Sequence, residues 1–238
     1  VEQGVEESQF LDSRIGLEKW REYVMMFGLG RRLGVDLPNE VTGKVPSIET
    51  YDRLYGKNRW KYSNIASLSI GQGELLVTPL QMANLGAILA NKGYFITPHV
   101  VDNIEGWPNP NIKKETLPFS PEFYETVIDG MELVIQAGSG IRGYLDTLKL
   151  AGKTSTVQNP HGEDHSGFMG FAPTDDPKIS IAAYVENAGQ GGRAAVSVAS
   201  LLAEQYVLGT VSRPWLEQYV LEERYLPENA PRLTLAED

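Results

Sequence analysis

Apolar residues recur at the spacing of an α-helix in four stretches of the chain. The predicted helices cover residues 16–27, residues 79–91, a stretch that begins at Ser120 and Pro121, and residues 194–208. Glycines follow the first three, which is where helices commonly end. The side chains predicted to face inward from the third helix are Phe123, Val127, Met131, Val134 and Ile135.

The helix at residues 79–91 has the clearest local signals. Thr78 is a suitable N-cap, Pro79 occupies the first helical position, and Gln81 is placed for a capping box. Apolar residues surround most of the helix circumference. We therefore expect this helix to be buried on several sides.

Three shorter stretches are rich in β-branched or apolar residues and predict strands at residues 148–157, 166–172 and 178–186. A polar turn separates the first two strands, and a second turn that contains two prolines separates the last two. Such short connections favour an antiparallel meander. The predicted fold class is α+β, with an antiparallel sheet covered by the helices that begin near Pro79, Pro121 and Ala194.

The remaining segments show little periodicity. Residues 33–59 contain several prolines and glycines and predict a long excursion with one helical turn near residues 48–55. Such a loop borders a functional site or is a surface insertion, and the sequence supports both equally. Residues 94–101 are predicted to be extended. Residues 1–13 read as a polar lead-in, and the chain from residue 212 onward reads as a tail that docks at most in part.

Composition narrows the class of protein. The chain has 238 residues, a length that suffices for one large domain or two small ones. Of these residues 42% are hydrophobic and 22% charged, which is typical of a globular protein. A net charge of −10 argues against nucleic-acid binding through a basic face. The absence of cysteine excludes disulfides and thiolate metal sites. No stretch offers the roughly 20 apolar residues of a spanning helix, and the start at Val1 rather than Met indicates a fragment or processed form.

Candidate chemistry lies on the first predicted strand. Lys153, Thr154 and Thr156 place a cation and two hydroxyl groups along a strand edge, which suits an anionic ligand such as a carboxylate. The spacing alone is a weak signal.

The HGEDH sequence at residues 161–165 is a second candidate site, because imidazole and carboxylate groups bind metal ions. Its spacing does not match H-E-x-x-H on a helix, so we favour a hydrogen-bonded turn over a metal site. His165 and Ser166 are adjacent and do not form a catalytic pair, because successive side chains on a strand point to opposite faces.

Three sequence blocks together resemble one enzyme family. The blocks are Gly152-Lys153-Thr154-Ser155-Thr156, the downstream HSGFMGFAP and the upstream GQGELLVTPLQMANLGAILANKG. They resemble the transpeptidase domain of class B penicillin-binding proteins, with the best fit to the elongation-type penicillin-binding protein 2. The resemblance implies a partial serine β-lactamase-like fold, with residues 1–211 as the C-terminal portion of that domain and residues 212–238 as a tail.

The resemblance also implies roles for the strand residues. Lys153 would orient the substrate carboxylate and assist proton transfer, and Thr154 and Thr156 would donate hydrogen bonds to that carboxylate. The backbone N–H of Thr156 would be one oxyanion donor. Ser155 belongs to the same substrate-binding strand but stands where the family has glycine, so its side chain is expected to crowd the pocket. No metal or organic cofactor is implied.

Two family signatures are absent. No serine in the chain has lysine three positions later, and none has asparagine two positions later, so the S-x-x-K nucleophile and the S-x-N element are missing. Truncation explains this most simply, and the chain alone is expected to be inactive. The alternative is a catalytically dead scaffold that docks partners through the loop at residues 33–59.

The resemblance further implies a membrane-anchored parent on the periplasmic side of the bacterial inner membrane. Its partners would be peptidoglycan stem peptides, β-lactams, the missing N-terminal part of its own domain and membrane proteins of cell elongation. Nucleic acid is not among them.

Overall fold

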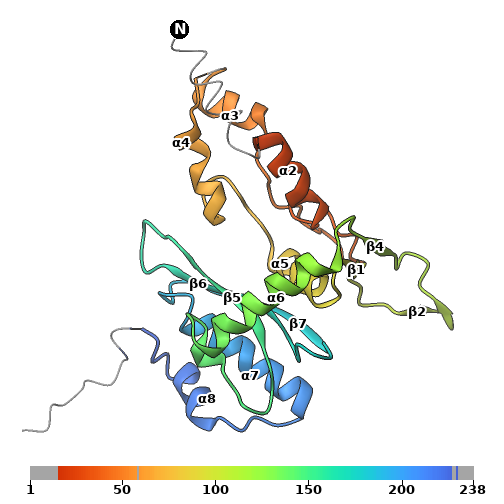
Figure 1. Ribbon diagram of the computed structural model, residues 1–238, viewed down its shortest axis with the longest axis vertical. Helices are drawn as coiled ribbons and strands as arrows, with labels where there is room; N and C mark the ends of the chain where they lie inside the picture. Colours follow the sequence, from red (N-terminus) through yellow and green to blue (C-terminus); the bar gives the residue numbers. More distant parts are fainter. Residues whose placement is uncertain (1–15, 58, 227–228, 230–238) are drawn as a thin grey trace, which may run out of the picture. The chain divides into compact units, whose positions relative to one another are not determined.

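The computed structural model describes residues 16–57, 59–226 and 229 of the chain. Figure 1 shows its helices and strands. The chain divides into two compact units, one of residues 1–81 and 96–117 and the other of residues 82–95 and 118–238. The predicted lead-in at residues 1–13 lies outside the described residues.

Among its described residues, the first unit contains four short helical elements before residue 79. They are α2 (Leu17–Met26), α3 (Ile48–Tyr55), α4 (Tyr62–Ile65) and the 3₁₀ helix η1 (Ala66–Ile70). Helix α3 confirms the one helical turn predicted near residues 48–55. It begins with a capping box formed by Ser47 and Thr50. Tyr51 is fully buried in a cluster with Leu17 and Leu68, and its hydroxyl donates to the Glu74 carboxylate at 2.6 Å.

A small hairpin that the sequence reading missed also belongs to this unit. Strands β2 (Asn103–Ile104) and β3 (Trp107–Pro108) pair antiparallel around a turn in which Glu105 and Gly106 both have positive φ. This is the backbone conformation of a type I′ turn, which suits two-residue hairpins. Strands β1 (Tyr94–Ile96) and β4 (Lys114–Thr116) form a further two-stranded sheet.

Helix α5 (Pro79–Ala90) confirms the strongest sequence prediction. The Thr78 backbone N–H donates to the Gln81 side-chain oxygen at 3.0 Å, and the Gln81 N–H donates to the Thr78 hydroxyl at 3.2 Å. This reciprocal pair is the predicted capping box. Gly93 follows with a φ of 115°, a conformation that favours glycine after a helix.

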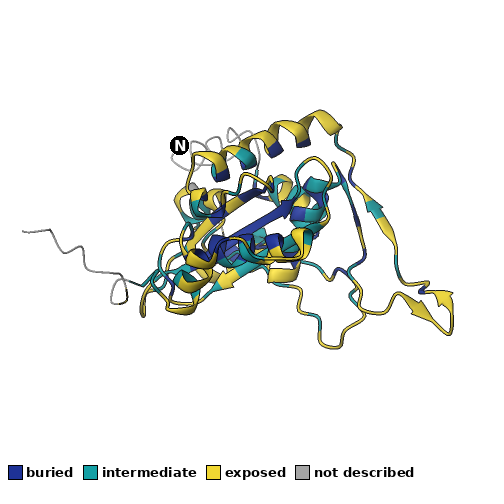
Figure 2. Ribbon diagram, turned by 90° about the horizontal axis from the view of Figure 1, so that it is seen from below, coloured by how far each residue is buried: buried dark blue, intermediate teal, exposed yellow. Residues whose placement is uncertain are grey.

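The second unit is organised around a three-stranded antiparallel sheet with the strand order β5-β6-β7. Its strands are β5 (Ala151–Val157), β6 (His165–Ala172) and β7 (Ile179–Val185). The predicted meander is therefore confirmed, although β5 starts three residues later than predicted. The central strand β6 is buried along almost its whole length. Figure 2 colours the buried residues dark blue.

Helices cover both faces of this sheet, which confirms the α+β class. Helix α7 (Ala194–Leu208) packs on β6 and β7, and the Ala195 N–H donates to the buried Ser166 hydroxyl at 3.0 Å. On the opposite face, the Ser180 hydroxyl donates to the Ala83 carbonyl of α5 at 2.7 Å. Helix α6 (Pro121–Gln136) packs against β5 and adds Ile135 to the core cluster shared with α7.

The inward face predicted for α6 is partly wrong. Phe123 and Val127 are exposed by 68% and 47%, whereas Met131 and Ile135 are buried as expected. The buried ridge starts instead at Tyr124, which is only 3% exposed. The helix carries two adjacent apolar ridges, one that starts at Phe123 and one that starts at Tyr124. The sequence pattern alone does not show which of the two ridges is buried.

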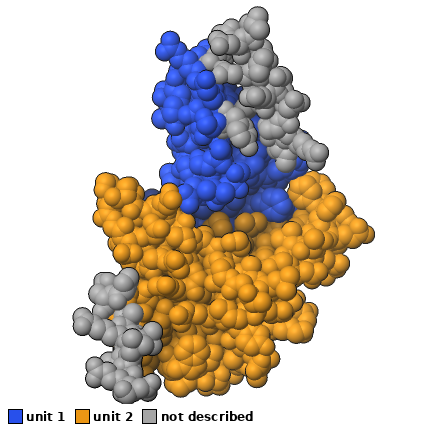
Figure 3. Space-filling view, turned by 60° about the vertical axis from the view of Figure 1, so that its left-hand side comes forward, with its two compact units in different colours: residues 1–81, 96–117 blue, residues 82–95, 118–238 orange. Residues whose placement is uncertain are grey.

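The segment predicted as a tail begins with helix α8 (Pro214–Leu221), which packs against α7 in the second unit (orange in Figure 3). Leu216 is fully buried, and Arg213 forms a buried ion pair with Glu204 at 3.0 Å. Across the residues that the structure describes, no helix has the length and apolar character needed to cross a membrane.

Candidate active-site strand

Strand β5 carries all four residues that the sequence predicts for the site, and its pairing with β6 defines two faces. The cross-strand partners are Lys153↔Met169, Thr154↔Phe168, Ser155↔Gly167 and Thr156↔Ser166. Because successive side chains alternate, Lys153 and Ser155 share one face and Thr154 and Thr156 share the other. In the described sheet β5 pairs only with β6, so its second edge is open.

Lys153 places an ammonium group on the exposed part of this strand. Its Nζ atom donates to the backbone oxygen of Thr154 at 2.6 Å. A lysine in this position offers its remaining donors to an anionic group that approaches the strand.

Thr154 is 7% exposed, and its hydroxyl oxygen lies 2.6 Å from the Ser139 hydroxyl oxygen. Ser139 is exposed and lies in the turn that follows α6. The two hydroxyl groups form a short chain from the strand toward solvent, which adds Ser139 to the candidate site. The sequence reading missed Ser139 because a contact between residues 15 positions apart leaves no periodic signal.

A glycine-rich connection at residues 189–192 packs against the same strand. The Gly191 N–H donates to the Thr156 hydroxyl oxygen at 3.0 Å. A Cβ atom on Gly191 would overlap the backbone of Ser155, and one on Gly192 would overlap the Ser139 carbonyl oxygen. The two glycines therefore allow a close approach that no larger residue permits.

Ser155 fits because its cross-strand partner is glycine. A Cβ atom built on Gly167 would overlap the Ser155 hydroxyl oxygen, so the hydroxymethyl group occupies space that Gly167 leaves open. This contact joins residues on two strands, so the local sequence around Ser155 does not predict it.

The polar turn between β5 and β6 is hydrogen-bonded, as predicted. The Asp164 carboxylate accepts from the Asn159 N–H at 3.1 Å, and His165 Nδ1 accepts from the Asn187 N–H at 3.0 Å. No group of three or more potential metal ligands occurs among the described residues. Ser166 is buried and bonds toward α7, while the His165 ring packs on Tyr184, so the adjacent pair does point to opposite faces.

Gly191→Ala is expected to lower the free energy of unfolding by about 3 kcal/mol, because the added methyl group must displace the Ser155 backbone. Chemical denaturation of the variant checks this. Gly130→Ala is the matched control, because Gly130 lies in α6 with nothing within 4 Å of the added atom. The control should gain about 0.5–1 kcal/mol from helix propensity. Equal stability of the two variants would contradict the close packing described for Gly191.

Comparison with known proteins places this strand in a family context. A family model described as "Penicillin binding protein transpeptidase domain" matches residues 7–204. The peptidoglycan D,D-transpeptidase MrdA of Acinetobacter baumannii is 35% identical over 206 residues, which cover 78% of this chain and 30% of that protein.

Two solved structures are similar in fold and sequence. The Pseudomonas aeruginosa PBP2 in complex with WCK 5153 has a TM-score of 0.70 and 30% identity, over 84% of this chain and 45% of that one. The PBP2 of the Helicobacter pylori complex with MreC has a TM-score of 0.67 and 27% identity, over 82% of this chain and 37% of that one. The chain thus spans about a third of the length of the curated relatives it matches.

Proposed function

Because the chain belongs to the penicillin-binding protein transpeptidase family, in its PBP2 (MrdA) type, we propose that it forms part of a peptidoglycan D,D-transpeptidase. The observation that carries the proposal is strand β5, whose second edge is unpaired in the described sheet and which carries Lys153, Thr154 and Thr156 within the matched region. In this reaction a serine attacks the D-Ala-D-Ala end of one stem peptide, and the terminal D-alanine leaves. An amine of a second stem peptide then accepts the acyl group.

The strand residues bind the substrate carboxylate in this proposal. Lys153 orients the carboxylate and assists proton transfer, while Thr154 and Thr156 donate hydrogen bonds to it. The exposed Ser139 hydroxyl is hydrogen-bonded to the Thr154 hydroxyl and continues this chain of polar groups to the solvent. The Thr156 N–H serves as one oxyanion donor, and removal of such a donor costs about 2.7–4 kcal/mol of transition-state stabilisation.

The nucleophile comes from outside these 238 residues. No serine here is followed by lysine at the third position, and Ser155 lies over Gly167 in the sheet. The chain alone is therefore inactive in this account.

The test uses the product of the whole reading frame and a peptidoglycan substrate with pentapeptide stems. Cross-linked dimers and free D-alanine should both form, and the 238-residue chain should yield neither. If the whole product folds but releases no D-alanine, the transpeptidase proposal is wrong. The result would then favour the alternative, a catalytically dead scaffold that binds partners.

Ser155→Gly should speed acylation by a β-lactam in the whole product, because it restores the glycine typical of this family and removes a side chain from the substrate-binding strand. The second-order rate constant for a fluorescent penicillin, measured by stopped flow, checks this. Thr147→Gly, in the exposed segment before β5, is the control for added backbone flexibility. An unchanged or slower rate for Ser155→Gly would show that the serine does not crowd the pocket.

We also propose a periplasmic location on a membrane-anchored parent, with a membrane protein of cell elongation as a partner. The Helicobacter pylori PBP2 was solved in a complex with MreC, which supports the partner. Binding of the whole product to the MreC protein of the same organism, measured by biolayer interferometry, would test it. A lack of binding at micromolar concentrations would remove this partner from the account.

A further inference from the structure

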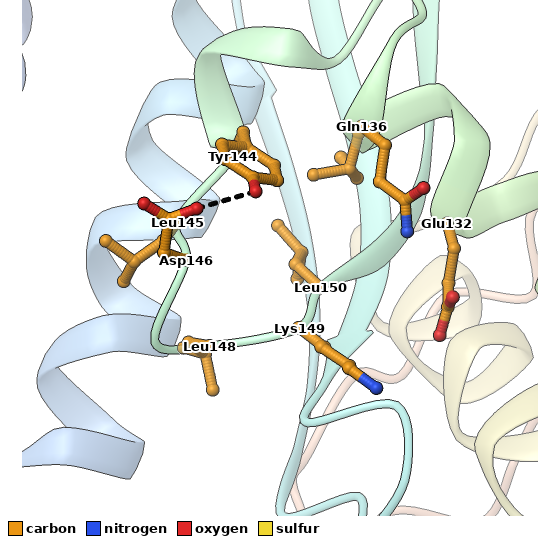
Figure 4. A pocket seen from close by; sticks show the side chains of 9 residues that line it. Glu132, Gln136, Tyr144, Leu145, Asp146, Leu148, Lys149 and Leu150 are labelled. Atoms are coloured by element: carbon orange, nitrogen blue, oxygen red, sulfur yellow. Dashed lines mark hydrogen bonds between the residues drawn. The ribbon is translucent and has the colours of Figure 1, made fainter.

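A pocket of about 300 Å³ lies at the start of β5, apart from the residues assigned to the substrate strand. Its walls come from the end of α6 and from the segment that leads into β5, as Figure 4 shows. The lining residues are Glu132, Ile135, Gln136, Tyr144, Leu145, Asp146, Leu148, Lys149 and Leu150. This volume is at the lower end of the range for small-molecule sites.

Apolar side chains form one part of the pocket wall, beside its polar and charged residues. Ile135, Leu148 and Leu150 are 2%, 5% and 6% exposed, and all three belong to the core cluster beneath the sheet. These side chains are held by packing and present a fixed surface to an aliphatic group.

Hydrogen bonds from Arg213 and Tyr144 hold the outer wall of the pocket. Arg213 Nη1 donates to the backbone oxygens of Arg142 and Tyr144 at 3.3 Å, and Arg213 is itself paired with the buried Glu204. The Tyr144 hydroxyl donates to the Asp146 carboxylate at 2.6 Å, visible as the dashed line in Figure 4. Hydrogen bonds within the chain therefore hold this wall in place.

Three charged side chains line this pocket. The Asp146 carboxylate accepts a hydrogen bond from the Tyr144 hydroxyl, and the opposite charges of Glu132 and Lys149 do not pair with each other. In the described part of the chain, neither the Glu132 carboxylate nor the Lys149 ammonium makes a hydrogen bond or an ion pair. The Gln136 amide also has no partner there. A ligand that carries one positive and one negative group satisfies both charges, whereas an anion is repelled by Glu132 and a cation by Lys149.

We propose that this pocket binds a small zwitterion with an aliphatic side chain, namely a free amino acid. Its ammonium group pairs with Glu132, its carboxylate pairs with Lys149, and its side chain lies against Leu148 and Leu150. The proposal does not rest on the transpeptidase function, because no residue of the pocket belongs to positions 153–156. It does place an amino-acid site directly before the strand that carries those positions.

The test titrates the 238-residue chain with D-leucine and L-leucine, measured separately by ¹H–¹⁵N NMR. At least one enantiomer should shift the amide resonances of residues 132–150, with a dissociation constant on the order of 1 mM. Leucinamide lacks the carboxylate and N-acetylleucine lacks the ammonium group, so each should bind at least about tenfold more weakly. These analogues test the charge pairing without any change in the protein.

Two variants test the residues. Glu132→Gln and Lys149→Met should each weaken binding at least about tenfold, because each leaves one ligand charge unpaired. Glu122→Gln on the same helix and Lys178→Met on the surface are the matched controls and should bind like the unchanged chain. The proposal is overturned by binding of neither enantiomer, by equal binding of leucine and its analogues, or by equal binding to the pocket variants and the controls.

Discussion

Glu204→Ala is expected to lower the free energy of unfolding by about 3–5 kcal/mol, because it leaves the buried Arg213 guanidinium without its counter-charge. Glu204 is fully buried in α7 and accepts hydrogen bonds from the Ser212 N–H and hydroxyl, both at 2.5 Å, and from Arg213 Nε at 3.0 Å. Arg213 in turn holds the backbone at Arg142 and Tyr144. The loss of one carboxylate therefore loosens α8 and the segment before β5 together.

Denaturation by urea measures the effect. Glu217→Ala, an exposed glutamate in the first turn of α8, is the control and should change stability by less than about 1 kcal/mol. A loss of similar size in both variants would mean that the ion pair does not hold α8 in place.

The pH dependence of this pair has a definite sign. Burial is the largest influence and raises the pKa of Glu204, but the hydrogen bonds from Ser212 and Arg213 together outweigh it and lower the pKa below its ordinary value of 4.5. A carboxyl group with a lowered folded-state pKa contributes stability above its unfolded pKa, and that contribution is lost as the pH falls through the folded value. The stability difference between the unchanged chain and Glu204→Gln should therefore shrink below about pH 4.5.

Lys153→Ala is expected to slow acylation of the whole reading-frame product by a fluorescent penicillin about 10²–10⁴-fold, the range typical for loss of a group that assists proton transfer. The physical reason is the removal of the Lys153 ammonium group, which we propose orients the substrate carboxylate at β5. Stopped-flow fluorescence measures the rate constant.

Lys178→Ala is the matched control for this substitution, because Lys178 pairs with Asp176 on the surface beside β7 and leaves β5 intact. It should acylate at the unchanged rate. If Lys153→Ala also acylated at that rate, the assignment of β5 as the carboxylate-binding strand would be wrong.

Much of the fold could be predicted because its signals are local. The capping box at Thr78 and Gln81 and the short polar turns of the meander involve residues within a few positions of each other, and each appears in the structure where the sequence places it. The residues of β5 were found in the same way, as neighbours on one strand.

The parts that were missed depend on contacts between distant residues. Ser139 meets Thr154 across 15 positions, and Ser155 is accommodated by Gly167 on the next strand. The buried pair of Glu204 and Arg213 makes the start of the predicted tail a docked helix, although a charged residue in a sequence usually indicates an exposed position. Only the packed structure decides which ridge of a helix is buried or which charge has a partner.

Intact-mass spectrometry after incubation with benzylpenicillin tests the central claim most directly, because it detects the acyl-serine bond itself. The account predicts a single covalent adduct on the product of the whole reading frame and none on the folded 238-residue chain, which has no S-x-x-K serine. A stable adduct on the 238-residue chain, or an unmodified whole product, would contradict the account of β5 as one wall of a transpeptidase cleft whose nucleophile lies elsewhere.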